Sequence, residues 1–270
     1  MPLNDLCRLA DVKLWLGRTD TNSDSLLASL ITRASRDIYS YLQRPQLLPR
    51  TVTEIRDGNG GTSLILKQWP VISVASVVAC GKTIPPCSAA SEFGTGYVFE
   101  QWDGAPPGRP QALSLRGCSF PTGAQSVSIV YQSGYQVAEE PQTVSGGTAT
   151  VNAPFGAWAS DIGVAYANGG ALENVASAPA VGQYALGATP GTYDFNTGDN
   201  GASVLISYGF IPSDLADACI ELVSERFKYS ERIGERTHSL GGNETVAFDT
   251  TRFTPLIEAM LQPYKNLLPV

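Results

Sequence analysis

The residues that most often perform catalysis are few and scattered in this chain of 270 residues. The single histidine, His238, stands in a glycine-rich stretch without a nucleophile motif nearby, so we interpret it as an exposed loop residue. Glu139 and Glu140 are adjacent carboxylates, the kind of pair that general acid–base chemistry uses. They precede Pro141, however, and we interpret them as a solvated linker. The sequence therefore predicts a protein that is not an enzyme.

Metal-binding and cofactor-binding patterns are likewise not recognised. The chain has five cysteines, which form no Cys-x-x-Cys motif: Cys7, Cys80, Cys87, Cys118 and Cys219. With one histidine, they do not make a zinc ligand set. Cys80 and Cys87 either close a small loop as a disulfide or stay reduced. We favour five reduced, mostly buried thiols, and we expect no metal and no cofactor.

Two further groups of residues have a chemical and a structural interpretation. Gly58, Gly60 and Gly61 follow an expected strand, but no helix opens after them, so they do not make a phosphate-binding loop. Tyr184 and Tyr193 either stack against sugars or fill the core of a β structure. We favour the core.

Composition indicates a soluble, folded chain. Hydrophobic residues make up 43% and charged residues 16%, which allows real cores. We find no signal peptide at the start and no apolar run long enough for a membrane span. The formal charge of −7 argues against general nucleic-acid binding. Between Arg116 and Arg226 there is no lysine or arginine, so this stretch either repels passing DNA or is simply kept soluble by its acids.

Both ends of the chain show helical periodicity. Apolar residues at 9–16 end at Gly17, and a second apolar stripe runs from Leu26 to Leu42 before Pro45. Near the other end, Ser213 is an N-cap candidate for a helix with its own apolar stripe. Thr254 and a following proline begin a last helix. The stretch 238–244 between them is expected to be a flexible loop.

The middle of the chain has the alternation of β-strands. Residues 51–56 and 63–67 are expected to pair as a hairpin around the turn at 57–61. Further strands are expected at these positions: 70–78, 97–100, 112–116, 127–131, 163–166, 182–186, 191–195 and 203–208. The fold class is therefore α+β, with a helical body (1–50 and 210–270), an antiparallel β region (51–134) and a β-sandwich-like module (135–209).

Two predicted strands have nearly the same sequence. Residues 126–131 resemble residues 203–208, and only the second of these stretches leads into a helix, at Ser213. If the first stretch once led directly to that helix, residues 135–209 are an insertion in a helical body.

The order of these pieces resembles the head–tail connector (adaptor, or head-completion) family of tailed bacteriophages. The stretches that carry the resemblance are 9–17, 26–31 with 41–45, 57–61 with 69–74, 211–228 with 231–234, and 256–264. Together they cover residues 5–134 and 210–268, and the module 135–209 lies outside the resemblance.

This resemblance implies a ring, usually of twelve subunits, in the neck of a virion assembled in the host cytoplasm. The ring docks under the portal protein and extends the channel through which genomic DNA passes without sequence-specific binding. Its tail side meets a stopper or tail terminator protein, and no membrane is involved. A glycan-binding or adhesive virion protein that uses residues 135–209 is the alternative.

The resemblance also suggests contact residues. The C-terminal segment of the family inserts into the portal, which implies a portal contact by these residues, unless they cap their own core: Leu256, Ile257, Met260, Leu261, Tyr264, Leu267 and Leu268. Oppositely charged residues of the two helical ends are predicted to pair between neighbouring subunits, unless the pairs are intramolecular or solvated: Arg33, Arg36, Arg44, Glu221, Glu225 and Glu231.

Overall fold

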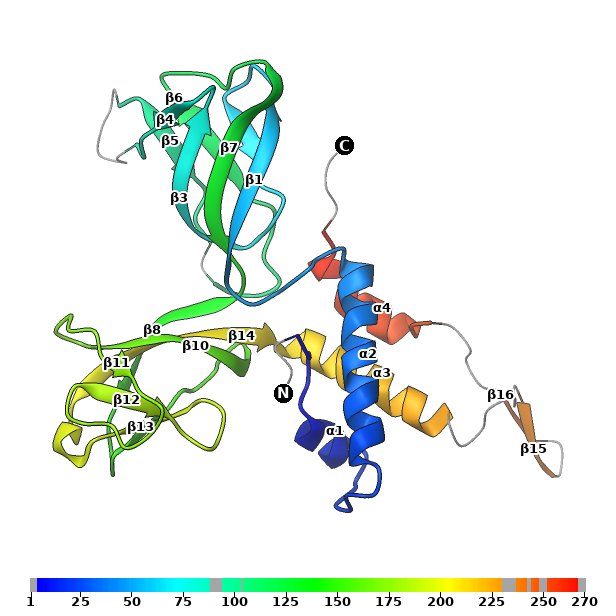
Figure 1. Cartoon of the computed structure of the whole chain (residues 1–270). Coiled ribbons are helices and arrows are strands. Elements are labelled where there is room, and N and C mark those ends of the chain that lie inside the picture. The colour runs from blue at the N-terminus through cyan, green and yellow to red at the C-terminus, as the bar shows by residue number, and fades with distance from the viewer. Residues whose placement is uncertain are drawn as a thin grey trace. The chain divides into compact units, whose positions relative to one another are not determined.

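A computed structural model describes residues 4–87, 94–102, 104–229, 237–241, 244–247 and 252–266 (Figure 1). The chain has a helical unit, within Met1–Gln46 and Pro212–Leu267, and a β unit, within Leu47–Ile211. The predicted α+β class is confirmed.

Both ends of the chain contribute helices to the helical unit, as their periodicity predicts. The elements of this unit are α1 (Leu9–Trp15), α2 (Asp24–Leu42), α3 (Ser213–Tyr229), β15 (Thr237–Gly241), β16 (Glu244–Ala247), α4 (Pro255–Leu261) and the 3₁₀ turn η2 (Gln262–Tyr264). The flexible loop expected at 238–244 is wrong in part, because β15 and β16 pair there as an antiparallel hairpin. Thr254 caps α4 as expected, since its hydroxyl accepts a hydrogen bond from the Ile257 amide at 3.4 Å.

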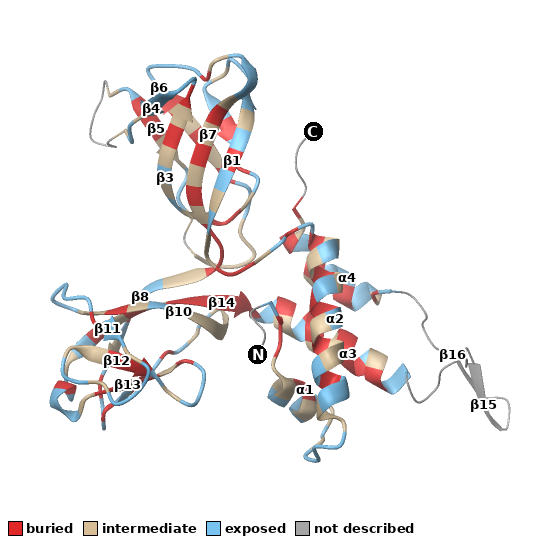
Figure 2. Cartoon of the chain, viewed as in Figure 1, coloured by how far each residue is buried: buried red, intermediate tan, exposed pale blue. Residues whose placement is uncertain are grey.

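The core of the helical unit lies where the apolar stripes of α2 and α3 meet, with α1 and α4 packed against α3 (Figure 2). Ile31 and Ile38 of α2 and Leu222 of α3 are fully buried. The thiols of Cys7 and Cys219 also lie inside it, with their sulfur atoms 3.4 Å apart. Burial of such apolar side chains supplies most of the stability of short helices like these.

The first half of the β unit is a two-sheet sandwich. Its strands are β1 (Arg50–Gly58), β2 (Ser63–Ile65), β3 (Val71–Ala79), β4 (Lys82–Ile84), β5 (Gly96–Phe99), β6 (Ala112–Arg116) and β7 (Gly123–Ser133). One sheet has the order β1-β7-β3-β4 and the other β2-β6-β5. The predicted hairpin of 51–56 with 63–67 is wrong, because β2 pairs with β6. That pairing places Leu64 and Leu113 in the core shared by the two sheets.

The second half of the β unit contains eight short elements. They are β8 (Gln136–Thr143), β9 (Thr148–Thr150), β10 (Gly156–Tyr166), β11 (Glu173–Asn174), β12 (Gln183–Leu186), β13 (Thr192–Phe195), the 3₁₀ turn η1 (Thr197–Asp199) and β14 (Ser203–Pro212). One sheet has the order β10-β14-β8 and the other β11-β12-β13-β9. Four of these strands (β10, β12, β13 and β14) lie at positions that the sequence predicts, whereas β8, β9 and β11 were not expected.

The two halves have the same topology. In each half, the last strand (β7 or β14) lies between the first strand (β1 or β8) and the third strand (β3 or β10). The second sheets correspond as well, since β2-β6-β5 matches β9-β13-β12. Three backbone hydrogen bonds, each from an amide to a carbonyl, recur at corresponding places. In the first half they join Cys80 to Ser126 (2.8 Å), Leu66 to Gln111 (3.0 Å) and Cys87 to Tyr97 (2.8 Å). In the second half the corresponding bonds join Ala167 to Ser203 (2.9 Å), Val151 to Gly191 (3.0 Å) and Val175 to Tyr184 (2.8 Å).

A buried tyrosine–glutamate pair marks the first half. The Tyr131 hydroxyl on β7 donates to Glu54 Oε2 on β1 at 2.7 Å. The same carboxylate accepts from the Lys67 amide at 3.1 Å and from the Arg56 guanidinium at 2.7 Å. The amide of the next residue, Gln68, donates to the Tyr131 oxygen at 3.1 Å. Each group of this buried cluster is therefore hydrogen-bonded, as buried polar groups require.

The same cluster recurs in the second half. Tyr208 on β14 donates to Glu140 on β8 at 2.5 Å, and the carboxylate also accepts from the Asn152 amide at 2.6 Å and from Gln142 at 2.7 Å. The amide of the following residue, Ala153, hydrogen-bonds to Tyr208. Residues 50–133 and 136–212 are therefore two copies of one domain, here called the first and the second β repeat. Glu140 is buried in this cluster, so its interpretation as a solvated linker residue is wrong.

Candidate functional site

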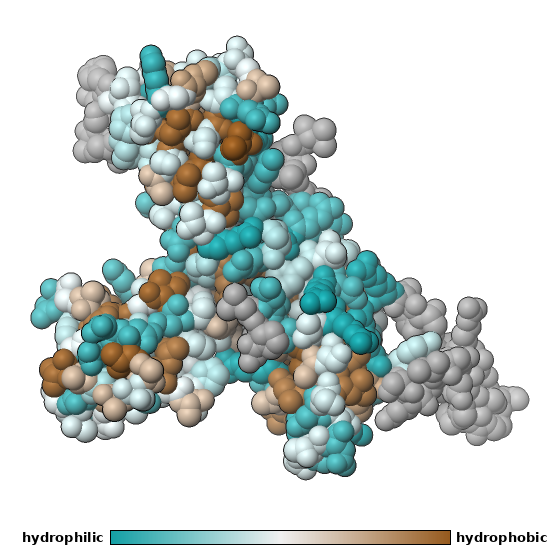
Figure 3. Space-filling view, in the orientation of Figure 1, coloured by the Kyte–Doolittle hydropathy of each residue, from teal (hydrophilic) through white to brown (hydrophobic). Residues whose placement is uncertain are grey.

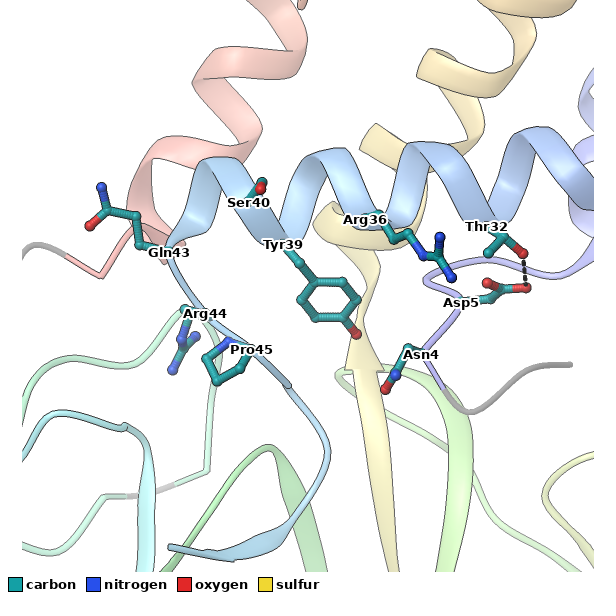
Figure 4. A pocket seen from close by; sticks show the side chains of 9 residues that line it. All are labelled: Asn4, Asp5, Thr32, Arg36, Tyr39, Ser40, Gln43, Arg44 and Pro45. Atoms are coloured by element: carbon teal, nitrogen blue, oxygen red, sulfur yellow. Dashed lines mark hydrogen bonds between the residues drawn. The ribbon is translucent and has the colours of Figure 1, made fainter. Parts of the chain in front are cut away.

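A cavity of about 650 Å³ lies in the helical unit, beside the middle and the C-terminal end of α2 (Figure 4). It is lined by Asn4, Asp5, Thr32, Arg36, Tyr39, Ser40, Gln43, Arg44 and Pro45. The helix positions Thr32, Arg36, Tyr39 and Ser40 on neighbouring turns, because residues three and four apart share one helix face. The described lining contains neither histidine nor cysteine.

Electrostatics in the cavity are set by two guanidinium groups and one buried carboxylate. Burial raises the pKa of Asp5, although a hydrogen bond from Thr32 (3.4 Å) and the charge of Arg36 act in the opposite direction. Burial also raises the pKa of Tyr39. In Figure 4 the Arg36 side chain extends toward Asp5, whereas Arg44 lies beside Pro45. A guanidinium in such a cavity is suited to bind a carboxylate of a partner protein.

The structure brings together two of the three arginines that the sequence singles out for subunit contacts. Arg36 and Arg44 line the cavity, but Arg44 is only 3% exposed, and Arg33 is exposed outside it. Of the predicted acidic partners, Glu221 is half-buried and Glu225 is exposed. The remaining one, Glu231, lies outside the described residues. The pairing of these groups between subunits stays a prediction.

Ionic contacts within the helical unit involve a residue that the sequence reading did not select. Asp37 on α2 accepts from Arg226 on α3 at 2.5 Å and from Arg252 at 3.2 Å. Burial of Asp37 would raise its pKa, but these two arginines more than offset it and the pKa is lowered. The spacing of Asp37 from Arg33 and Arg36 on the same helix could not reveal a partner nearly two hundred residues away.

The residues predicted to contact a portal protein fall into three groups. Ile257, Leu261 and Tyr264 are buried in the helical unit, and the Tyr264 hydroxyl donates to Asp214 at 3.0 Å. Leu256 is 55% exposed and Met260 is half-buried. The last two, Leu267 and Leu268, lie outside the described residues. Only part of the predicted set is thus available to a partner in this conformation, and the contact itself stays a prediction.

Exposed apolar side chains on the helices are the feature that sequence reasoning missed. Leu14 is 83% exposed and Trp15 is 64% exposed, both on α1, and Leu26 on α2 is also exposed. Large apolar side chains at this level of exposure commonly mark protein–protein contacts. The signal was present, because the run from Val12 to Leu16 is apolar on more sides than one short helix can bury.

The other candidate groups have structural roles. Tyr184 and Tyr193 are buried in the core of the second β repeat and donate to Asp161 at 2.7 and 3.2 Å, so the core interpretation is confirmed. Cys7 and Cys219 are buried thiols, whereas Cys80 and Cys118 are exposed, so the expectation of mostly buried cysteines is wrong for these two.

Within the described ranges, no three histidine, cysteine or acidic side chains gather as metal ligands would. Of the helices in the same ranges, none has the length and apolar character that crossing a bilayer would demand.

Comparisons with known proteins give weak structural similarity and no sequence match. No family model matches the sequence, and no curated protein matches it. Among solved structures, a chain from the "Neck of empty GTA particle computed with C6 symmetry" aligns with 100% of this chain and 93% of its own length. The two share 12% sequence identity with a TM-score of 0.37, a similarity too low to establish a common fold.

Proposed function

We propose that this protein is a structural component of a virion neck, a head-to-tail connector without catalytic activity. The observation that supports the proposal most directly is the helical unit. Residues from both ends of the chain form it around α2 and α3, and they contain most of the stretches in which the sequence resembles connector proteins. In this proposal the chain forms a ring beneath the portal, extends the DNA channel and carries the attachment surface for a tail-side protein.

The exposed apolar residues of the helical unit are the proposed contacts with other proteins of the neck. In this proposal the connector contacts the portal on one side and a tail-side protein on the other, so each subunit needs two separate contact surfaces. Leu14 and Trp15 on α1 provide one apolar surface, and Leu256 on α4 belongs to another segment of the chain. Apolar contacts of this kind are what a partner would bury.

The charge of the chain suits a channel that DNA passes through without binding. Six acidic residues and no basic residue lie in the second β repeat: Glu139, Glu140, Asp161, Glu173, Asp194 and Asp199. Glu140 and Asp199 are buried, and the other four are at least partly exposed. An acidic surface repels phosphates, whereas stable DNA binding requires clustered lysine and arginine. We therefore expect no sequence-specific contact with the genome.

The mass of the assembly is the first test. Twelve chains of 28.6 kDa would weigh about 343 kDa, which light scattering separates clearly from a monomer or a trimer. The purified protein should reach the mass of a ring, alone or after mixing with the cognate portal protein. A stable trimer that ignores the portal would contradict the proposal and favour an adhesive protein.

The portal contact can be tested at a single exposed side chain. Removing the whole C-terminal segment would be uninformative, because Ile257, Leu261 and Tyr264 belong to the core of the helical unit. Leu256→Glu changes only an exposed position and should abolish capture of the chain by portal rings. The matched control is Ile65→Glu, an exposed apolar residue of β2 outside the helical unit. Equal capture of wild type and Leu256→Glu would show that α4 does not contact the portal.

A further inference from the structure

In each β repeat, the described residues on the outer face of one sheet are at least partly exposed. In the first repeat, the inward residues of β7 (Val127, Ile129 and Tyr131) fill the core. Alternation along a strand therefore directs their neighbours to the outer face. The outer face of this sheet includes Thr53, Ile55, Ser76, Val78, Ser128 and Val130.

This face has no charged residue among those six, and its apolar members form a cross-strand row. Ile55 pairs with Ser128, which pairs with Val78, and in the next row Val130 lies between Thr53 and Ser76. Ile55 is 57% exposed. In Figure 3, hydrophobic side chains appear between pale ones where β3, β7 and β1 of this repeat face the viewer. A sheet face whose two central rows are uncharged and half apolar is unusual for a surface that only contacts water.

The second repeat has an apolar row at the corresponding positions. Pro141 pairs with Leu205, and Ala165 lies on β10, the strand on the other side of β14. These residues correspond to Ile55, Ser128 and Val78 of the first repeat. Ile162 is an exposed apolar residue of the same strand, β10.

The two repeats differ in charge, and the difference extends to the two faces. On the second face, Glu139 is exposed at the place of Thr53, and its amide donates to the Ser207 hydroxyl of β14, whereas the two rows of the first face carry no charged residue. The second repeat has six acidic residues and no basic one, a formal charge of −6. The first has six basic residues (Arg50, Arg56, Lys67, Lys82, Arg109 and Arg116) against five acidic ones (Glu54, Asp57, Glu92, Glu100 and Asp103), a formal charge of +1. Two second faces would bring their Glu139 carboxylates together and would repel each other, whereas a first and a second face would not.

We propose that the outer sheet face of the first repeat binds the outer sheet face of the second repeat in a neighbouring copy of this chain. Such a contact joins two different surfaces, so it passes from chain to chain and closes when the rotation between copies completes a circle. The proposal specifies how subunits of the proposed connector contact one another, and the closure of the ring depends on that proposed function. A ring built this way has twice as many β repeats as chains, arranged in alternation.

Two variants of the full-length chain test the contact. Val130→Glu places a carboxylate on the first face, and Leu205→Glu places one on the second. Both side chains point away from their cores, so each variant should fold as the wild type does. Each variant alone should associate with itself at least tenfold more weakly than wild type, as measured by sedimentation velocity.

Mixing the two variants distinguishes this contact from all symmetric alternatives. The Leu205→Glu chain keeps an intact first face and the Val130→Glu chain keeps an intact second face. The mixture should therefore form a one-to-one dimer of about 57 kDa, twice the 28.6 kDa of one chain, and nothing larger. If instead Leu205→Glu alone dimerised through two first faces, or if the mixture stayed monomeric, the proposal would be wrong.

Matched controls place the same substitution on other surfaces. Ile65→Glu lies on β2 in the second sheet of the first repeat, and Val181→Glu lies in a turn of the second repeat; both side chains are exposed. Neither should change self-association. Weakening by the controls as strong as by Val130→Glu would overturn the proposal. Capture by portal rings is measured in parallel. A chain that self-associates through these faces but does not bind the portal would contradict the connector role and leave the contact between the faces intact.

Discussion

The two β repeats share an internal framework but differ in their surfaces. Both place a glutamate on the first strand, a tyrosine on the last, and two consecutive backbone amides that complete the cluster. The formal charges of the whole repeats have diverged to +1 and −6. The comparison indicates that the buried cluster is what the domain needs to fold, while the surface was free to become specific for a partner.

The second sheets of the repeats also differ in their packing. The first repeat fills its core with aliphatic residues of β2 and β6, such as Leu64 and Leu113. The second repeat uses Tyr193 at the position of Leu113 and holds its hydroxyl with Asp161 and Trp158. A larger aromatic opposite the small Ala149 keeps the volume of the core similar. One topology thus accommodates two different sets of core side chains.

The largest expected effect comes from giving the first repeat a residue of the second. Gly58 lies four residues after Glu54, where the second repeat has the buried Val144. A Cβ at Gly58 would lie 1.6 Å from the Pro121 carbonyl oxygen. Gly58→Val should therefore destabilise the first repeat by about 3 kcal/mol, the upper range for overpacking. Hydrogen exchange should rise in 50–133 and not in 136–210. Gly61→Val, in the nearby turn, is the control and should change little.

The tyrosines should be the next most sensitive positions, and equally so in both repeats. Tyr131→Phe removes the donor to Glu54 and the acceptor of the Gln68 amide, and Tyr208→Phe does the same for Glu140 and Ala153. Each change should cost about 2 kcal/mol, the usual effect for a hydrogen bond to a buried carboxylate.

The matched control for these variants is Tyr97→Phe, whose hydroxyl donates only to the Val74 carbonyl at 3.2 Å. It should cost about 1 kcal/mol. Chemical denaturation monitored by hydrogen exchange in each repeat would measure all three. A cost for Tyr208→Phe below that of the control would show that the clusters are not equivalent.

A smaller effect tests the one partner that differs between the clusters. Glu54 accepts from the Arg56 guanidinium, whereas Glu140 accepts from the neutral amide of Gln142. Arg56→Gln should destabilise the first repeat by about 0.5 kcal/mol, because the guanidinium is partly exposed and its ion pair is screened. Gln142→Arg should stabilise the second repeat by a similar amount. Both differences should shrink in high salt, and effects that persist there would rule out an ionic origin.

Most helices and strands could be predicted from the sequence, but the duplication of the β domain was only partly visible in it. Periodicity identified the helices at both ends and most strands, and the similarity of 126–131 to 203–208 was visible. The rest of the repeat was hidden, because β8 contains Pro141 and a bulge with Glu139 at φ 54°, which break the alternation of a strand. Contacts between distant segments, such as Glu140 with Tyr208 or Asp37 with Arg226, leave no periodic signal.

The cavity beside α2 was only partly predictable for the same reason. The sequence singled out Arg36 and Arg44 by their charge, and the structure places both in its lining. Asp5 could not be included, because it precedes α1 and reaches α2 only through the fold.

Alkaline pH offers the last test of the equivalence between the repeats. Burial and the hydrogen bond to a carboxylate raise the pKa of Tyr131 and of Tyr208. Each folded repeat therefore keeps this proton at a pH at which the unfolded chain loses it, above about 10. Stability is then fully present below pH 10 and falls as the pH rises, because the folded state binds more protons. Other tyrosines with a raised pKa add to the slope of unfolding free energy against pH, namely Tyr97 in the first repeat and Tyr166, Tyr184 and Tyr193 in the second. The total slopes of the repeats therefore differ, but Tyr131→Phe and Tyr208→Phe should each flatten the slope of their own repeat by the same amount. A slope that flattens for only one variant would show that only one cluster holds its tyrosine proton, and the equivalence would then be limited to geometry.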